Sequence, residues 1–167
     1  MPSPAMLSAG QVKPKVYLET TIPSLLTAWP TRDVLIAGQQ QATRDWWKER
    51  RHRYELYVSV LVMKEVERGD VTAATQQLAA LAVCQVLPFP KEAEELTRAL
   101  LASRLIPAKS EADAAHVAIA AVHGMDFLLT WNCRHIANAA IVEKLRDVCA
   151  REGFPAPVIC TPHELMV

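Results

Sequence analysis

The sequence predicts one α/β domain in three layers, α/β/α, with a parallel central sheet of about four to five strands. Two observations predict this class. Short apolar segments alternate with longer segments whose apolar residues recur at helical spacing, which is typical of a parallel sheet covered on both faces. The chain has 167 residues, which fits one domain and leaves little room for two.

Five apolar segments are predicted to be strands, and they span residues 15–18, 56–59, 84–87, 127–130 and 158–160. The first reads KVYL and the fourth FLLT, and near-continuous apolar runs of this kind fit strands that are buried on both faces. Thr20–Pro23 is expected to break the first strand, and Pro88 and Pro90 to close the third.

Helical periodicity predicts helices over residues 33–53, 60–68, 72–82, 92–104, 110–123 and 136–151, with a terminal turn over 162–166. Ser59 is placed to cap the second helix, and Gly124 to end the fifth. Ser110 and Asp113 have the spacing of a capping box. In the first helix, Leu35, Ala42 and Trp46 are expected on the apolar side. Residues 1–14 lack periodicity and are expected to form a flexible N-terminal tail, so that the domain spans 15–167.

The composition limits the possible partners and compartment. Hydrophobic residues make up 51%, and 18 basic residues balance 18 acidic ones, so binding of nucleic acid requires a local patch. No apolar run approaches the roughly 20 residues that span a bilayer, and the first residues do not resemble a secretory signal. The four cysteines form no CxxC pair or zinc motif, and a reducing cytoplasm is the expected compartment.

Four oxygen-bearing side chains come from four segments near the expected carboxyl ends of the strands, where open α/β sheets bind ligands. Glu19 directly follows the first strand, and Asn132 lies just beyond the fourth. Asp113 lies in the first turn of the helix before that fourth strand, and Glu65 lies on the helix after the second. Hard cations such as Mg²⁺ and Mn²⁺ prefer such oxygen ligands. The pattern therefore indicates a metal site.

Each of these residues also has a simpler interpretation. An acidic residue at a helix start, such as Asp113, is common because it favours the helix dipole. Glu65 lies among other charged residues and can be a solvated side chain. Glu19 is the least ordinary, because a charge that directly follows an apolar strand is usually paired or bound to metal.

The motifs resemble those of the PIN-domain ribonucleases, most closely the VapC-like toxins of toxin–antitoxin pairs. The resemblance rests on YLETT at Tyr17–Thr21, VSVLVMKEVERG at Val58–Gly69, ADAAHVAIAA at Ala112–Ala121 and LLTWNCRHIAN at Leu128–Asn138. These four motifs occur in the family's order and at plausible spacing, and the resemblance covers about residues 15 to 165. It implies a PIN-like fold and the cleavage of RNA with bound metal ions.

The resemblance also implies the roles of particular residues. Mg²⁺ or Mn²⁺ would be held by Glu19, Glu65 and Asp113, with Asn132 in the fourth catalytic position and Thr20, Thr21 and Ser59 in support. Glu19 stands where the family usually has Asp, and Asn132 stands where it has an acidic residue. The missing charge puts occupancy by two metal ions in doubt. Expected partners are an RNA substrate, a small antitoxin and a second copy in a homodimer, with no membrane contact.

Contacts to RNA are expected close to the fourth strand. Trp131 could stack on an unpaired base or close the end of the sheet as a lid. Arg134 and His135 could contact phosphate, and His135 could instead be structural or transfer protons. His116 is expected only to pack on its helix.

A second candidate for RNA contact is the basic run Arg44–Arg53, which could track a phosphate backbone or form a solvated helix face. Within it, Trp46 and Trp47 are adjacent, so they diverge by about 100° on a helix. One of them could therefore cover a partner surface.

Two other functions compete with the nuclease. One is a binding module for nucleic acid or protein on a PIN scaffold with weak or no catalysis, which Asn132 favours because a fold does not guarantee a function. The other is an unrelated phosphate-handling α/β enzyme, but the sequence contains no Gly-rich phosphate loop to support it.

Overall fold

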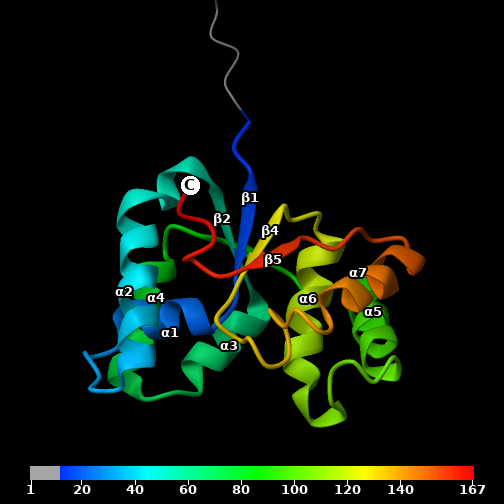
Figure 1. The fold of residues 1–167 in the computed structure, drawn as a ribbon, viewed down its shortest axis with the longest axis horizontal. Coiled ribbons are helices and arrows are strands. Elements are labelled where there is room, and N and C mark those ends of the chain that lie inside the picture. The colour runs from blue at the N-terminus through cyan, green and yellow to red at the C-terminus, as the bar shows by residue number, and fades with distance from the viewer. Residues whose placement is uncertain (1–11) are drawn as a thin grey trace, which may run out of the picture.

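Five parallel strands form one sheet between two layers of helices in the computed structural model, which describes residues 12–167 (Figure 1). The strands are β1 (Lys15–Leu18), β2 (Glu55–Ser59), β3 (Gln85–Leu87), β4 (Phe127–Leu129) and β5 (Val158–Cys160). The predicted fold class and the positions of the strands are confirmed. Of the predicted tail, residues 1–11 lie outside the described residues, and Pro14 already pairs with β2 through its carbonyl oxygen and the Glu55 N–H, 2.9 Å apart.

The strand order β3-β2-β1-β4-β5 places β1 at the centre of the sheet. The chain first builds outward from β1 to β2 and β3, and then returns to place β4 and β5 on the other side of β1. Val16 pairs with Leu56 of β2 and with Phe127 of β4. The strand order therefore reverses between β1 and β4, and the carboxyl ends at such a reversal form the crevice in which α/β proteins bind ligands.

The helices are α1 (Thr21–Thr27), α2 (Val34–Glu49), α3 (Val60–Glu67), α4 (Val71–Leu81), α5 (Lys91–Ala102), α6 (Glu111–Val122) and α7 (Val142–Arg151), with 3₁₀ turns at Arg51–Arg53 and Ala108–Ser110. In Figure 1, α1, α2 and α4 lie on one side of the sheet and α5, α6 and α7 on the other. None of the helices in residues 12–167 is long and apolar enough to cross a membrane.

The core is continuous from the sheet into both layers of helices. Leu128 and Leu129 of β4 are fully buried, and so is Trp46 of α2. Helix α6 is buried without interruption from Ala114 to Ala121. Its many alanines remove side-chain bulk, so the helix packs closely between the sheet and α5. This buried helix carries two of the polar side chains of the candidate site, at fixed positions relative to β1.

The segment after β1 forms a helix, α1, that the sequence pattern did not predict. Pro23 is the third residue of α1, where a proline is tolerated because the N–H groups of the first helical turn have no partner within the helix. The first N–H, from Thr21, instead donates to the Glu19 carboxylate at 3.1 Å. Glu19, at the end of β1, thus also accepts a hydrogen bond from the first residue of α1.

The predicted helix over residues 136–151 was wrong at its start, because α7 begins only at Val142. Two asparagines hold the preceding residues in turns. The Asn132 side chain accepts the His135 N–H at 3.0 Å, and the Asn138 side chain accepts the Ala140 N–H at 2.9 Å. Such side-chain bonds compete with helical backbone bonds. The loop after β4 is therefore irregular, and its side chains reach the candidate site.

Two details of the other helices also differ from prediction. Ser110 makes no side-chain cap on α6, so the predicted capping box with Asp113 is absent. Leu35 is 80% exposed instead of facing the core. Ser59 does cap α3, as expected, by accepting the Val62 N–H at 3.3 Å.

Two glycines in helical surroundings predict opposite effects on stability when each is replaced by alanine. Gly38 lies inside α2 with open space around its Cα, so Gly38→Ala should stabilise the fold by about 0.5–1 kcal/mol. Gly124 ends α6 with φ of +65°, so Gly124→Ala should destabilise it by about 1 kcal/mol or more. Urea unfolding measures both variants, and changes of the same sign would contradict the backbone assignment.

Candidate active site

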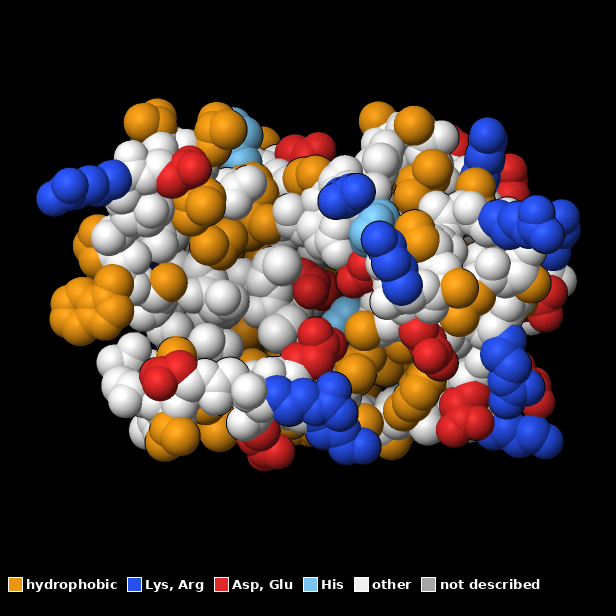
Figure 2. Space-filling view, turned by 90° about the horizontal axis from the view of Figure 1, so that it is seen from below, with side chains coloured by type: hydrophobic (Ala, Val, Ile, Leu, Met, Phe, Trp, Pro, Cys, Tyr) orange, Lys and Arg blue, Asp and Glu red, His pale blue; other side chains and the backbone are white. Residues whose placement is uncertain are grey.

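The edge of the sheet at which the strands end faces the viewer in Figure 2, where acidic side chains and histidines gather around a central hollow. Residues from the ends of β1, β2 and β4, and from helices α3 and α6, are joined there by hydrogen bonds. Three of the four predicted catalytic residues contribute a carboxylate to this network, and Asn132 contributes an amide.

Glu19 is the most buried of the four predicted catalytic residues, with an exposed fraction of 4%. Its Oε2 accepts three hydrogen bonds, from the Thr21 N–H at 3.1 Å, the Thr21 hydroxyl at 2.5 Å and the Thr130 hydroxyl at 2.8 Å. A buried carboxylate is tolerated only when such donors replace water. The supporting role predicted for Thr21 fits this geometry. Thr20 does not take part, because its enclosed hydroxyl has no partner among the described residues.

A chain of hydrogen bonds leads from Glu19 through the loop after β4 to α6. The Thr130 hydroxyl donates to Glu19 and accepts the Asn132 N–H at 2.9 Å. The Asn132 amide oxygen accepts the His135 N–H, and the His135 Nδ1 lies 2.8 Å from Asp113 Oδ2. The carboxylate of Asp113 is thus held by a histidine of this loop.

A second chain connects Glu65 of α3 with β1 through α6. Glu65 Oε1 lies 2.6 Å from His116 Nε2, and His116 Nδ1 lies 2.7 Å from the Tyr17 hydroxyl. The Tyr17 hydroxyl lies 2.8 Å from the Ser59 hydroxyl. The expectation that His116 only packs on its helix was wrong. The signal for this network is a tyrosine in the middle of a buried strand, since a buried tyrosine hydroxyl usually needs a partner.

The two chains surround the same space. Tyr17 and Glu19 point to one side of β1 because they are two residues apart, and Asp113 and His116 are neighbours on one face of α6 because they are three apart. Burial raises the pKa of Tyr17, its hydrogen bond with Ser59 lowers it to a smaller extent, and the carboxylates of Glu19 and Glu65 raise it further.

The donor set fits a hard cation in its chemistry, although its side chains are not arranged as ligands. Within residues 12–167, no group of three or more Asp, Glu, His or Cys side chains is placed to hold one metal ion. Each carboxylate uses one oxygen for a protein hydrogen bond, while Oε1 of Glu19, Oε2 of Glu65 and Oδ1 of Asp113 accept none from the described residues. Joint ligation at about 2.0–2.2 Å requires these side chains to turn toward one another.

Asn132 is engaged by its own loop. Its amide oxygen accepts the N–H of His135, three residues further on, so this oxygen already has a partner within the loop. The residue in the fourth acidic position therefore shapes the loop that carries His135, and it adds no charge to the site.

Of the residues expected to contact RNA, Trp131 is the most constrained. Its indole N–H donates to the Thr43 hydroxyl at 2.8 Å, its backbone N–H donates to the Thr21 hydroxyl, and its ring packs on the core. This arrangement favours the lid at the end of the sheet. Arg134 is exposed, and its side chain has no hydrogen bond with residues 12–167.

The basic run Arg44–Arg53 lies mostly away from this edge, because it leads into the amino end of β2. Arg44 donates to the Ala28 carbonyl at 2.7 Å, Arg50 donates to the Met166 carbonyl at 2.6 Å, and Arg51 lies over the Trp47 ring. These guanidinium groups stabilise the chain itself. Trp46 is in the core and Trp47 is covered by Arg51, so neither offers the free aromatic surface that was expected.

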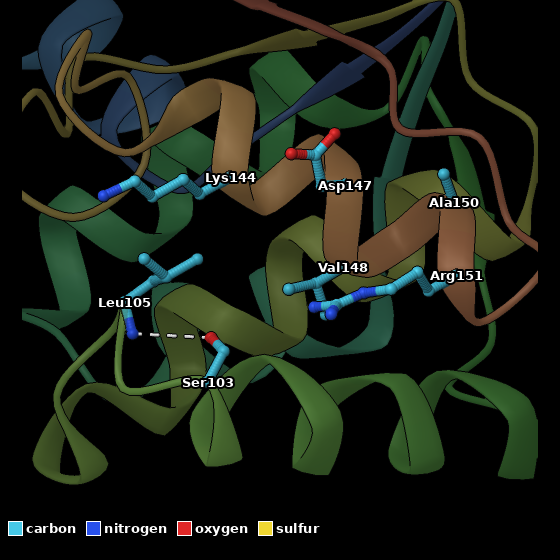
Figure 3. Close-up of a pocket in the computed structure, with 7 residues that line it drawn as sticks. All are labelled: Ser103, Leu105, Lys144, Asp147, Val148, Ala150 and Arg151. Atoms are coloured by element: carbon cyan, nitrogen blue, oxygen red, sulfur yellow. Dashed lines mark hydrogen bonds between the residues drawn. The ribbon is translucent and has the colours of Figure 1, made fainter.

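A separate open pocket of about 580 Å³ lies between the end of α5 and α7 (Figure 3). Ser103 and Leu105 line one side, and Lys144, Asp147 and Arg151 line the other. Its charged side chains all come from exposed positions on one helix, and none of the candidate catalytic residues lines it. The pocket therefore adds nothing to the candidate active site.

The fold and its edge of carboxylates define a PIN-like α/β domain. The structure is similar to that of VapBC2 from Rickettsia felis bound to a DNA fragment from their promoter, with a TM-score of 0.51 and 10% identity over 87% of this chain and 97% of that chain. It is also similar to DNA-bound VapBC from Salmonella typhimurium, with a TM-score of 0.50 and 18% identity over 89% of this chain and 98% of that chain.

No protein-family model matches the sequence, and no curated protein matches it. At the identities of the two VapBC structures the likeness shows the fold. The resemblance to VapC-like toxins expected from the four motifs is thus confirmed in three dimensions at the level of the fold.

The Thr130 hydroxyl joins Glu19 to the loop after β4. Its removal should therefore destabilise the fold. Thr130→Val keeps the shape but leaves the Asn132 N–H without its acceptor and Glu19 without one donor. We expect a loss of about 1–3 kcal/mol in the free energy of unfolding. Thr130→Ser keeps the hydroxyl and should lose less. Equal losses in urea unfolding would show that the hydroxyl is not what matters.

Proposed function

We propose that this protein is a metal-dependent endoribonuclease that hydrolyses RNA phosphodiester bonds, and that it is the toxin of a toxin–antitoxin pair. One observation carries the proposal. Glu19, Glu65 and Asp113 come from the end of β1, from α3 and from α6 into hydrogen-bond chains at the carboxyl edge of the sheet, and each keeps one carboxylate oxygen free of hydrogen bonds from the described residues. Three carboxylates in one place repel one another, and a hard cation relieves that repulsion.

The three carboxylates would hold Mg²⁺ or Mn²⁺, which supplies an activated water and stabilises the charge that develops on the phosphate. The protein contributes the preparation of the site. Three hydrogen bonds orient Glu19. His116 orients Glu65, and His135 orients Asp113, each through one carboxylate oxygen. Exposed Arg134, beside His135, is placed to contact a phosphate of the substrate.

A small antitoxin and a second copy of the chain are the proposed partners. The fold shared with the two VapBC structures supports the antitoxin. An exposed apolar patch supports a protein partner of either kind, and it comprises Trp29, Val34, Leu35 and Ile36, with exposed fractions of 85%, 83%, 80% and 41%. Large exposed apolar side chains gathered on one segment are a candidate contact surface for another protein.

The engaged amide of Asn132 favours a second candidate, a module on a PIN scaffold that binds nucleic acid or protein with little catalysis. With this oxygen bonded to the His135 N–H, the site has three carboxylates and no fourth negative charge. The two functions differ in whether removing one of the three carboxylates changes cleavage.

Asp113→Asn should weaken Mn²⁺ binding and nearly abolish the cleavage of single-stranded RNA, because it removes one of three charges that hold the cation. Asp147→Asn, the same change on an exposed surface of α7, is the matched control and should change neither. Calorimetric metal titration and an RNA cleavage assay measure both effects. Unchanged cleavage in Asp113→Asn would support the binding module.

Asn132→Asp should act in the opposite direction and tighten Mn²⁺ binding, because it restores a fourth negative charge. The loop should survive, since a carboxylate oxygen can also accept the His135 N–H. The same calorimetric titration measures the change. Weaker Mn²⁺ binding in this variant would mean that position 132 does not face the cation.

The apolar patch predicts self-association. The wild-type protein should be a dimer by light scattering at high micromolar concentration, and Leu35→Ser should shift it toward the monomer because Leu35 is exposed and supports little of the core. Val158→Ser, also at an exposed apolar position but on β5, is the control and should leave the dimer intact. A wild-type monomer would rule out the homodimer.

A further inference from the structure

His116 is a buried histidine whose two ring nitrogens are both engaged by side chains from other elements. Only 1% of its surface is exposed. Its Nε2 lies 2.6 Å from Glu65 Oε1, and its Nδ1 lies 2.7 Å from the Tyr17 hydroxyl. A buried imidazole needs a partner for each ring nitrogen, and here both partners are side chains from other elements. Both contacts together indicate that the imidazole has a set orientation.

One arrangement of the hydroxyl and imidazole protons satisfies every donor and acceptor in this chain of hydrogen bonds. Ser59 Oγ accepts the Val62 N–H, which leaves its own proton for the Tyr17 oxygen. Tyr17 then donates to His116 Nδ1, and the Nε2 proton is donated to the Glu65 carboxylate. Reversing the order would leave the proton of the fully buried Ser59 hydroxyl without an acceptor among these groups, which is unfavourable.

We propose that Ser59, Tyr17 and His116 form a positioning relay that restrains the Glu65 carboxylate at the carboxyl edge and limits how it turns to bind a metal ion. The relay sets the imidazole tautomer, and the Nε2–H holds Oε1 of Glu65, while Oε2 accepts no hydrogen bond from the described residues and is the oxygen left for the ion. Glu65 lies in the middle of α3, and 28% of its side-chain surface is exposed, so without this contact its carboxylate could turn into solvent. The metal-binding role rests on the proposed function, whereas the relay itself does not.

The tautomer is tested first, in the metal-free protein. In a ¹⁵N-histidine-labelled sample, long-range proton–nitrogen correlation should show His116 with its proton on Nε2 and with Nδ1 unprotonated. Tyr17→Phe removes the hydroxyl that donates to Nδ1, so in this variant the Nδ1 resonance should move toward that of a ring nitrogen without a hydrogen bond, while the Glu65 carboxylate keeps the proton on Nε2. A proton on Nδ1 in the wild-type protein, or a mixture there, would overturn the relay.

Two amide substitutions then separate the contact with Glu65 from the contact with Tyr17. In His116→Gln the amide nitrogen reaches the position of Nε2 and can still donate to Glu65, whereas in His116→Asn the amide reaches only the position of Nδ1. Mn²⁺ affinity measured by calorimetry should fall roughly tenfold in His116→Asn, as is typical when a group that orients a metal ligand is lost. His116→Gln should stay closer to wild type.

His123→Asn is the matched control for the same substitution. His123 follows the last residue of α6, and its ring makes a hydrogen bond only with the Pro88 carbonyl among the described residues, so its loss should leave Mn²⁺ affinity unchanged. Thermal unfolding of every variant separates a loss of folding from a loss of affinity. If His116→Asn does not fold, the wild-type tautomer and the Nδ1 resonance of Tyr17→Phe decide the relay.

The outcomes distinguish this proposal from the proposed function. Equal Mn²⁺ affinities in wild type, His116→Gln and His116→Asn would overturn the positioning role while leaving the metal site intact. A wild-type protein that does not bind Mn²⁺ would overturn the proposed function and, with it, the role of the relay in metal binding. In that case the tautomer of His116 would still confirm or overturn the relay as a structural device.

Discussion

The carboxylate of Glu19, buried at the end of the central strand, is the constraint on which the site depends. A charge in that position is stable only if protein donors replace its water. The donors come from both sides of the reversal in strand order, with Thr21 at the start of α1 and Thr130 at the end of β4. Satisfying this one group therefore joins β1, α1 and β4 at the edge where the other acidic side chains arrive.

The other two carboxylates are stabilised by a different device. Glu65 and Asp113 each contact a histidine, His116 on α6 and His135 in the loop after β4. Without a bound cation, these two histidines restrain the carboxylates, so that the like charges do not turn toward one another. The same contacts leave one oxygen of each carboxylate free. Ligation of one cation by all three carboxylates would require the side chains to turn toward one another.

Local pattern was a good guide to the sheet and a poor guide to the connections. The strands are short apolar runs with one clear interpretation, so their positions followed from composition and alternation. Helix α1 was missed because Pro23 signals a break, although proline is tolerated in a first turn. Helix α7 was started too early because Asn132 and Asn138 form turns whose side-chain bonds have no helical or strand period. Leu35 was placed in the core because periodicity does not reveal which apolar side chain remains uncovered.

The sequence by itself determined the α/β class, the parallel sheet and the four polar residues that reach its carboxyl edge, because strand ends and helix starts follow from local spacing. Only the tertiary structure decided how those residues are held. The partners of Glu19, Glu65 and Asp113 are Thr130, His116 and His135, which lie far from them in the chain or in an irregular loop. Hydrogen-bond pairing across such separations depends on strand order and on the packing of α6 against β1, and no local pattern of residues encodes either.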